Sequence, residues 1–291
     1  MEKLDRLGWA AAVSFVSYGL RIGVRANTPE VMDQILELLP PGTKPARGPR
    51  VQLLYSVVAG GTKPRTRIRR FNMLYADAAR IVRTTVWERV RDTLEMDLQL
   101  YVAENARRRV FVHAGVVGWR GRAIVIPGRS LSGKTTLVRA LVEAGGTFRS
   151  DEYAVLDSRG QVHPYVATMS VRDSTGGHVE KIHPETLGWP IGVKPLPVGL
   201  VVVTSHRSGA RWRPRQLSAG RAVMELLAHT VSARQQPERA LATLRLAISN
   251  AMVIKGVRGE AEEIAAALLS RAADRAPSIS TADSGRRAAA M

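Results

Sequence analysis

The stretch from residue 123 to residue 144 constrains the fold of this chain more than any other. The apolar run Ala123–Ile126 leads directly into Gly-Arg-Ser-Leu-Ser-Gly-Lys-Thr at 128–135, and a helical pattern continues to Ala144. This is G-x-x-x-x-G-K-[ST] in a strand, loop and helix setting. The two glycines let the loop curl so that backbone N–H groups point at phosphate oxygens, and the helix adds the positive end of its dipole. The sequence therefore predicts a loop that binds a nucleoside triphosphate.

Each residue of this loop has an expected role. Lys134 is expected to reach the terminal phosphates, and the Thr135 hydroxyl to complete the coordination of Mg²⁺. The expected cofactors are therefore ATP and Mg²⁺. The alternatives are an ordinary glycine turn that caps a helix and a loop inherited from an ancestor that bound nucleotide. The expected nucleotide contacts are Gly128, Arg129, Ser130, Leu131, Ser132, Gly133, Lys134, Thr135 and Thr136, where Arg129 faces either phosphate or solvent.

Two adjacent acids follow the loop and its helix. The apolar run Leu200–Thr204 ends without an acid, so Asp151-Glu152 is the better source of a carboxylate at the mouth of the site. One carboxylate can hold Mg²⁺ while the other accepts a proton from an attacking hydroxyl. The expected metal ligands are Thr135, Asp151 and Glu152. The alternative is a solvated, charged turn.

The residues around this loop resemble a known family. The stretches His113-Ala114-Gly115, Ile126-Pro127-Gly128, Gly133–Leu137, Glu143-Ala144-Gly145 and Ser150–Leu156 resemble the catalytic domain of bacterial HPr kinase/phosphorylase and of related HPr-kinase-like proteins. The resemblance implies a P-loop fold shared with phosphoenolpyruvate carboxykinase. It also implies that Asp151 is the general base for a serine hydroxyl and that Glu152 is its metal-associated neighbour. His113 matches a histidine near the phosphates, although a lone strand histidine is as often a core or capping residue.

Other parts of the sequence depart from that family. Leu131 stands where HPr kinase has a second loop glycine, and Thr136 replaces an acidic residue. A second signature, a Glu-Ile-Arg-Gly-like stretch, is absent, which argues against HPr itself as the acceptor. The resemblance implies catalytic roles for Asp151, Lys134 and His113. Related kinases of peptide-natural-product clusters act on a precursor peptide's serine, and that acceptor class stays open here, as does a metabolite.

Periodicity predicts the order of elements. The fold class is α/β: a small α+β N-terminal region (1–106), a P-loop kinase domain (107–275) of the HPr kinase/phosphoenolpyruvate carboxykinase type with C-terminal helices, and a disordered tail (276–291). Strands are predicted over 13–26, 51–58, 66–75, 110–113, 116–117, 123–126, 154–156, 162–165 and 200–204. Helices are predicted over 28–39, 86–106, 135–144, 219–233, 238–250 and 260–273. A hairpin turn is predicted at 157–160.

The net charge of +18 has two interpretations. It attracts an acidic partner, or it reflects an arginine-rich composition with solvated side chains. Nucleic acid is not expected, because no nucleic-acid motif accompanies the charge and aromatic residues make up only 5% of the chain. The absence of cysteine excludes disulfides and thiolate metal sites. No apolar stretch is long enough for a membrane helix and no secretory signal is evident, so we expect a cytoplasmic protein without membrane contact.

Two functional hypotheses follow. The first is an ATP- and Mg²⁺-dependent kinase that phosphorylates a hydroxyl, with a serine of a protein or peptide as the expected acceptor; homo-oligomerisation stays open. Arg172, Lys181 and Lys194 are downstream bases that could neutralise the transferred phosphoryl group, and loop 175–178 could close over the substrate. The second is a non-catalytic nucleotide-binding regulator or scaffold whose basic surface engages nucleic acid or an acidic partner.

Overall fold

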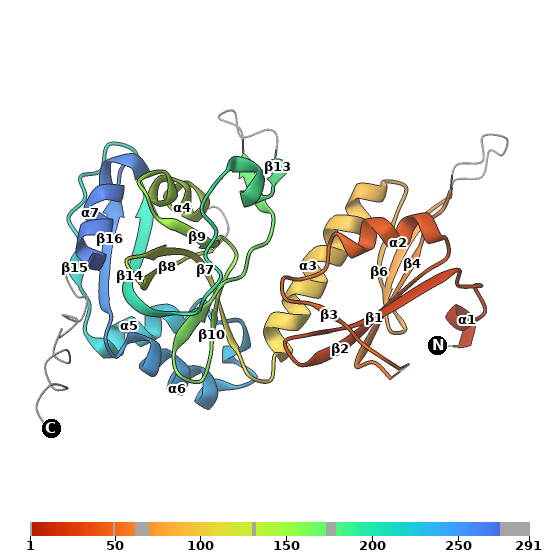
Figure 1. The fold of residues 1–291 in the computed structure, drawn as a ribbon. Helices are drawn as coiled ribbons and strands as arrows, with labels where there is room; N and C mark the ends of the chain where they lie inside the picture. Colours follow the sequence, from red (N-terminus) through yellow and green to blue (C-terminus); the bar gives the residue numbers. More distant parts are fainter. Residues whose placement is uncertain (1, 49, 62–69, 130–131, 173–178, 274–291) are drawn as a thin grey trace, which may run out of the picture.

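The computed structural model describes residues 2–48, 50–61, 70–129, 132–172 and 179–273, and it has a mixed α/β fold with two large sheets (Figure 1). The predicted tail, the loop 175–178 and residues 66–69 of the predicted strand 66–75 lie outside the described residues. No helix among these residues is long and apolar enough to span a bilayer.

The first sheet has the strand order β3-β1-β2-β4-β5-β6. A turn at Tyr18-Gly19, where both residues have positive φ, joins β1 to β2, so the predicted single strand 13–26 is a hairpin. β2 and β4 are parallel, and the chain between them forms helix α2. The strands are β1 (Ala11–Ser17), β2 (Leu20–Ala26), β3 (Lys44–Pro45), β4 (Leu53–Val58), β5 (Asn72–Ala76) and β6 (Ala79–Thr84), with helices α1 (Glu2–Asp5) and α2 (Pro29–Leu36).

Helix α3 (Trp87–Asn105) follows the first sheet and supplies one apolar stripe to its core. Val90, Leu94, Leu98 and Val102 are buried at the four-residue spacing that predicted this helix. The same core continues into the second part of the chain, where Tyr18 packs edge-on against Phe111 with ring centroids 5.0 Å apart. The apolar core therefore links the first sheet to the strand that begins the second.

The second sheet has the order β11-β10-β7-β8-β14-β16-β15, and β9 pairs with β7. Within it, β8, β14 and β16 are parallel, and β7 is antiparallel to β8. The strands are β7 (Val110–Trp119), β8 (Arg122–Pro127), β9 (Thr147–Ser150), β10 (Tyr153–Leu156), β11 (Gln161–His163), β14 (Leu196–His206), β15 (Arg215–Gln216) and β16 (Met252–Arg258). A separate hairpin, β12 (Met169–Arg172) and β13 (Val179–Ile182), precedes the short helix η1 (Pro184–Leu187).

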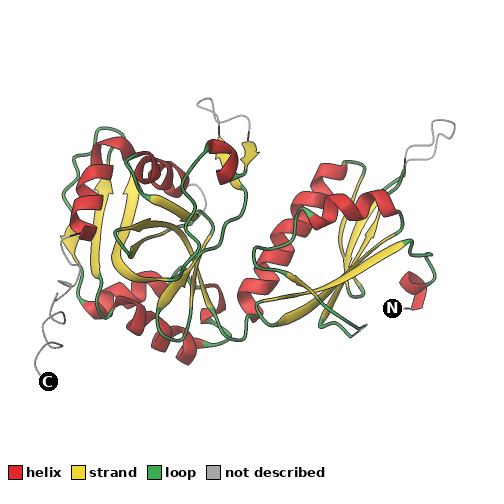
Figure 2. Cartoon of the chain, in the orientation of Figure 1, coloured by secondary structure: helices red, strands yellow, loops and turns green. Residues whose placement is uncertain are grey.

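Helices cover both faces of the second sheet (Figure 2). α4 (Lys134–Glu143) and α7 (Ala261–Ala273) share one apolar core with β8, β14 and β16. α5 (Ala219–Leu227) and α6 (Pro237–Ile248) share the other. Because both faces are buried, β8 and the middle of β14 carry uninterrupted apolar runs.

Several elements differ from the sequence prediction. Helix α1 and strands β3, β6, β9, β12, β13 and β15 were not predicted. β7 is one strand where two short ones were predicted. The predicted helix 219–233 is α5 followed by a turn and the short helix η2 (Val231–Ala233), because Thr230 forms a β-bridge with Val112 of β7. β16 was not predicted at all, although it lies beside β14 in the sheet. The predicted hairpin turn 157–160 is confirmed between β10 and β11.

Candidate functional site

The loop 128–133 leaves the second sheet at the carboxyl end of a buried strand. β8 is buried from Ala123 to Pro127, and α4 begins at Lys134, directly after Gly133. Because β8, β14 and β16 are parallel, their carboxyl ends meet at one edge of the sheet beside this loop. Open α/β sheets bind ligands outside that edge. The fold therefore presents the predicted phosphate loop where a ligand can reach it.

Backbone geometry explains both glycines of the loop. Gly133 has a φ of 82°, in the left-handed region, and a Cβ there would lie 2.5 Å from Nη2 of Arg258. A Cβ at Gly128 would lie 2.5 Å from Ser132 Oγ. The Gly128 N–H donates to the His113 carbonyl at 3.2 Å, which ties the start of the loop to β7. A side chain at Gly133 would strain the backbone and displace the Arg258 guanidinium, and one at Gly128 would displace the Ser132 hydroxyl.

The turn between β9 and β10 brings Asp151 to the first turn of α4. Thr135 Oγ1 donates a hydrogen bond to Asp151 Oδ2 at 2.7 Å. The other oxygen, Oδ1, is buried and accepts no hydrogen bond from any described residue. Burial raises the pKa of Asp151 from 3.8 to about 6, although the Thr135 hydrogen bond and the Lys134 charge oppose that rise. Asp151 is thus a buried carboxylate with one oxygen that has no hydrogen-bond partner among the described residues.

Glu152, the neighbouring acid, has a different environment. Its Oε1 lies 3.2 Å from Nε2 of His113, and its side chain is 40% exposed. Burial would raise the pKa of Glu152, but the hydrogen bond and charge of His113, together with Lys134, outweigh it and leave the pKa below its usual value. Glu152 is therefore an ionised carboxylate at neutral pH.

Lys134 is a buried cation under the loop. The residue is only 7% exposed, and its Nζ donates to the Arg129 carbonyl at 3.4 Å. Burial lowers the pKa of Lys134, while the negative charges of Asp151 and Glu152 act in the opposite direction. A further anion at the loop would favour the charged amine.

The oxygen donors near Lys134 fit a hard cation. Thr135, Asp151 and Glu152 offer a hydroxyl and two carboxylates, and the unpartnered Asp151 Oδ1 is a free ligand atom. Mg²⁺ usually binds one or two carboxylates and completes its shell with water and substrate phosphates. Among the residues that the structure describes, no three His, Cys, Asp or Glu side chains group closely enough to hold a metal by themselves. These oxygen atoms thus suit a cation that takes its remaining ligands from a bound phosphate group and from water.

Arg258 is a site residue that the sequence analysis missed. It ends β16, is only 2% exposed, and donates from Nη2 to the Gly133 carbonyl at 2.9 Å. Its Nε is buried without an acceptor among the described residues, and burial lowers its pKa. Its partner in the β14–β16 register is His206, whose Nε2 lies 3.3 Å from Glu260 Oε1. A buried guanidinium therefore braces the last residue of the loop.

An open cavity of about 450 Å³ lies beside His113, which contacts Glu152. It is lined by His113 and Arg129 together with residues 228–231, which follow α5. The His113 N–H donates to the His229 carbonyl at 2.8 Å, so β7 fixes this wall. Burial, followed by the charges of His113 and Arg129, lowers the pKa of His229 and favours its neutral form. This cavity has room for a small acceptor group next to His113.

The remaining predicted loop residues are placed as follows. Arg129 and Thr136 are exposed, and Ser132 is half-buried. Ser130 and Leu131 lie outside the described residues. Of the predicted site residues, the structure brings together Lys134, Thr135, Asp151, Glu152 and His113.

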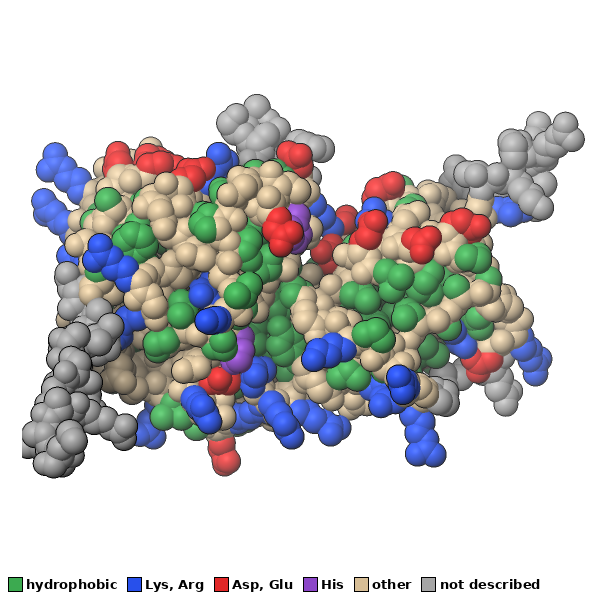
Figure 3. Space-filling model, viewed as in Figure 1, with side chains coloured by type: hydrophobic (Ala, Val, Ile, Leu, Met, Phe, Trp, Pro, Cys, Tyr) green, Lys and Arg blue, Asp and Glu red, His purple; other side chains and the backbone are tan. Residues whose placement is uncertain are grey.

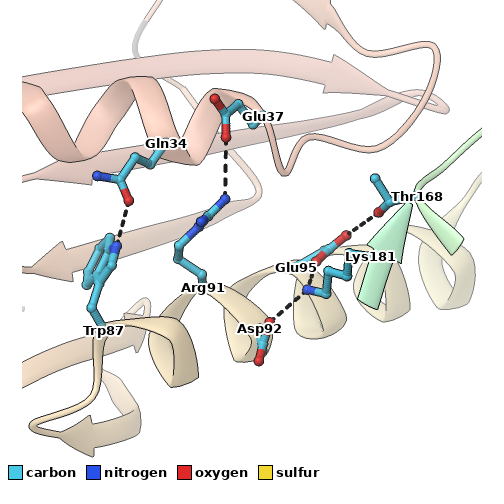
Figure 4. Close-up of polar contacts among 8 residues, drawn as sticks. All are labelled: Gln34, Glu37, Trp87, Arg91, Asp92, Glu95, Thr168 and Lys181. Carbon is cyan, nitrogen blue, oxygen red and sulfur yellow. Dashed lines mark hydrogen bonds and ion pairs between the residues drawn. The ribbon is translucent and has the colours of Figure 1, made fainter. Parts of the chain in front are cut away.

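Of the predicted downstream bases, Lys181 and Lys194 do not gather at the loop, and the side chain of Arg172 lies outside the described part of the structure. Lys181 on β13 donates to Asp92 at 2.7 Å and to Glu95 at 2.6 Å, both on α3 (Figure 4). Thr168 donates to the same Glu95 at 3.4 Å. Lys194 is exposed in the loop before β14. Lys181 is thus engaged with the N-terminal part of the chain and is not a phosphate ligand in this arrangement.

Helix α3, which contacts Lys181 and Thr168 through Glu95, also forms polar contacts with α2 and the residue that follows it. Trp87 Nε1 donates to Gln34 at 2.7 Å, and Arg91 lies 3.4 Å from Glu37 (Figure 4). Polar contacts therefore attach α3 both to the first sheet's helix and to the β12–β13 hairpin.

Comparison with solved structures gives distant matches, among them the following one. The HPr(Ser) kinase/phosphatase from Coxiella burnetii is similar over 55% of this chain and 92% of its own, with 14% sequence identity and a TM-score of 0.30. No family model matches the chain, and the search of curated proteins gave no match. The similarity is distant, and the function is therefore argued from the site itself.

Proposed function

We propose that this protein is an ATP- and Mg²⁺-dependent kinase that transfers the γ-phosphoryl group to a hydroxyl, in particular a serine of a protein or peptide. The observation that carries the proposal is the contact between the two halves of the site. Thr135, the last residue of the loop motif, donates directly to Asp151 of the acidic pair. The proposed nucleotide-binding loop is therefore in direct contact with a carboxylate that can accept a proton.

Each residue has a role in this reaction. The loop amides and Lys134 bind the triphosphate and neutralise charge on the transferred group. Arg258 holds the Gly133 carbonyl and so fixes the loop that presents those amides. Thr135 and Glu152 hold Mg²⁺, which when bound neutralises charge on the phosphate oxygens. His113 orients the Glu152 carboxylate.

Asp151 is proposed to accept the proton of the acceptor hydroxyl. A general base works best when its pKa lies near the working pH, because it is then both ionised and basic. Burial moves the pKa of Asp151 to about 6, which meets this condition better than an ordinary carboxylate does. As the hydroxyl oxygen bonds to phosphorus, the bond to the leaving nucleoside diphosphate breaks and the proton moves to Asp151.

Thermal unfolding with and without Mg-ATP tests the nucleotide site. At a ligand concentration about 100 times Kd, binding adds about 2.7 kcal/mol to the stability of the folded state. We expect this stabilisation in the wild type and in Lys194→Ala, a control at an exposed lysine, but not in Lys134→Ala. Absence of stabilisation in the wild type, or its persistence in Lys134→Ala, would contradict the proposal.

Phosphoryl transfer is tested separately with γ-labelled ATP and a library of serine-containing peptides. Asp151→Asn should abolish transfer while Mg-ATP still stabilises the fold. The rival function, a non-catalytic nucleotide-binding regulator, predicts nucleotide binding without transfer to any acceptor and no functional effect of Asp151→Asn.

A further inference from the structure

Two neighbouring cavities lie on the second sheet at β15 and β16, away from the acidic pair. Their volumes are about 530 and 550 Å³, and they share two lining residues, Arg215 and Lys255. The first cavity lies between β15 and α5. The second lies at the carboxyl ends of β14 and β16. Because they share a wall, they form one continuous surface, which we call the β15 groove.

Positive charge dominates the β15 groove. Its cationic residues are Arg213, Arg215, Arg221 and Lys255, and its one acid is Glu225, which is already paired with Lys255. The three arginines form no ion pair with any residue that the structure describes. In Figure 3, Lys and Arg side chains gather along the left side, over β15 and the loop before it. These cations are available to an external anion.

The walls of the groove are partly apolar. Met224 is 61% exposed beside Leu217, and Val203 and Val257 line the second cavity. Among the described residues, no aromatic side chain lines either cavity. Bases of single-stranded nucleic acid bind mainly by stacking on aromatic rings, which this groove does not offer. Apolar side chains of a peptide, in contrast, can use such walls.

β15 also provides an open backbone edge. It is the last strand of the sheet in the described part of the chain and pairs only with β16. Exposed edge strands can pair with an added extended segment, whose alternate side chains then fill neighbouring pockets. Cations and apolar walls beside such an edge match a segment that alternates acidic and apolar residues.

We propose that the β15 groove binds an acidic, extended segment of a partner protein. Thr204, Ser205 and Val257 line the groove, and the residues that follow them, His206 and Arg258, lie beside the phosphate loop. A bound segment would therefore run from the sheet edge toward the loop. This docking does not depend on the proposed phosphoryl transfer, because it requires neither nucleotide nor the acidic pair.

Fluorescence anisotropy tests the groove without nucleotide. The probe is a fluorescein-labelled dodecapeptide of alternating Glu and Leu, bound to the full chain. Arg215→Glu reverses the charge shared by both cavities and should weaken binding at least about tenfold at low salt. The matched control is Arg80→Glu, an exposed arginine on β6, the edge strand of the first sheet, which should bind the peptide as the wild type does. Arg221→Glu on α5 is a second, independent variant.

Distinct outcomes would overturn the proposal. Equal weakening by Arg215→Glu and Arg80→Glu would show that net charge alone attracts the peptide. Unchanged binding in both Arg215→Glu and Arg221→Glu would place the peptide elsewhere. A single-stranded oligonucleotide of equal charge that binds more tightly than the peptide, and loses affinity in Arg215→Glu, would assign the groove to nucleic acid instead. Circular dichroism of each variant separates these results from a failure to fold.

Discussion

Replacing Asp151 with asparagine should stabilise the protein when neither nucleotide nor Mg²⁺ is present. Burial raises the pKa of this carboxyl from 3.8 to about 6. The folded protein therefore holds the proton more tightly than the unfolded chain does, and ionisation opposes folding as the pH rises through about 6. Asparagine carries no charge at any pH and can still accept the Thr135 hydrogen bond, so the variant avoids this cost.

The size of the effect follows from the pKa difference. A rise of about two pKa units corresponds to at most about 3 kcal/mol above pH ~6, at 1.36 kcal/mol per unit. Solvent near the site reduces this value. For a chain of this size, a gain of about 2 kcal/mol raises Tm by roughly 4–8 °C. As the pH falls well below 3.8, Asp151 becomes protonated in both folded and unfolded states, so the gain should shrink strongly by about pH 4 and vanish below it.

Thermal or urea unfolding with a chelator present, at about pH 8 and about pH 4, measures this difference. The matched control is Asp157→Asn, because Asp157 has the opposite shift. Although burial opposes it, the His163 hydrogen bond and the Gln161 and Arg159 amides lower the pKa of Asp157. That variant should lose stability near pH 8. An Asp151→Asn variant that is no more stable than the wild type near pH 8, or whose gain persists at low pH, would refute the reasoning.

Two further predictions concern Arg258 and Lys181. Arg258→Lys keeps the charge but loses the planar guanidinium that donates from Nη2 to the Gly133 carbonyl and from Nη1 to the Gly259 carbonyl, so we expect the affinity for Mg-ATP to fall about tenfold in calorimetry. Unchanged affinity would show that Arg258 does not support the loop. Lys181→Ala should leave the affinity for Mg-ATP unchanged and lower the stability of the protein by less than about 1 kcal/mol. Added salt should reduce this loss, because the Lys181 ammonium is partly exposed. A large loss of affinity for Mg-ATP would show that Lys181 is a phosphate ligand.

The sequence predicted the local part of the site and not its long-range part. The loop 128–135 and its helix were evident because strand, glycine turn and helix are consecutive in the chain. Arg258 was not, since it reaches the loop only through the parallel pairing of β16 with β14. That strand escaped prediction because its apolar run, Met252–Ile254, is short and is followed by Lys255 and Gly256. The sequence did hold an indication of this strand, because α/β chains alternate helices with strands and an apolar run lies between the helices predicted over 238–250 and 260–273.

Lys181 shows the opposite error. Its place downstream of the loop made it a candidate phosphate ligand, because distance along the chain was the only guide. In the fold, the β12–β13 hairpin instead contacts α3, where Asp92 and Glu95 take up its charge. No pattern within residues 169–182 reveals that contact, since its acidic partners come from the N-terminal part of the chain.

The division of labour between Asp151 and Glu152 also needed the fold. Position in the chain alone did not separate these adjacent acids, and only the family resemblance assigned Asp151 as the base and Glu152 as its metal-associated neighbour. The turn between β9 and β10 directs Asp151 to Thr135, in a buried environment that raises its pKa, and Glu152 to His113, which lowers its pKa. Environments that separate the pKa values of two neighbouring acids assign their roles. Asp151 is therefore better suited to receive a proton, and Glu152, which stays ionised, to hold a cation.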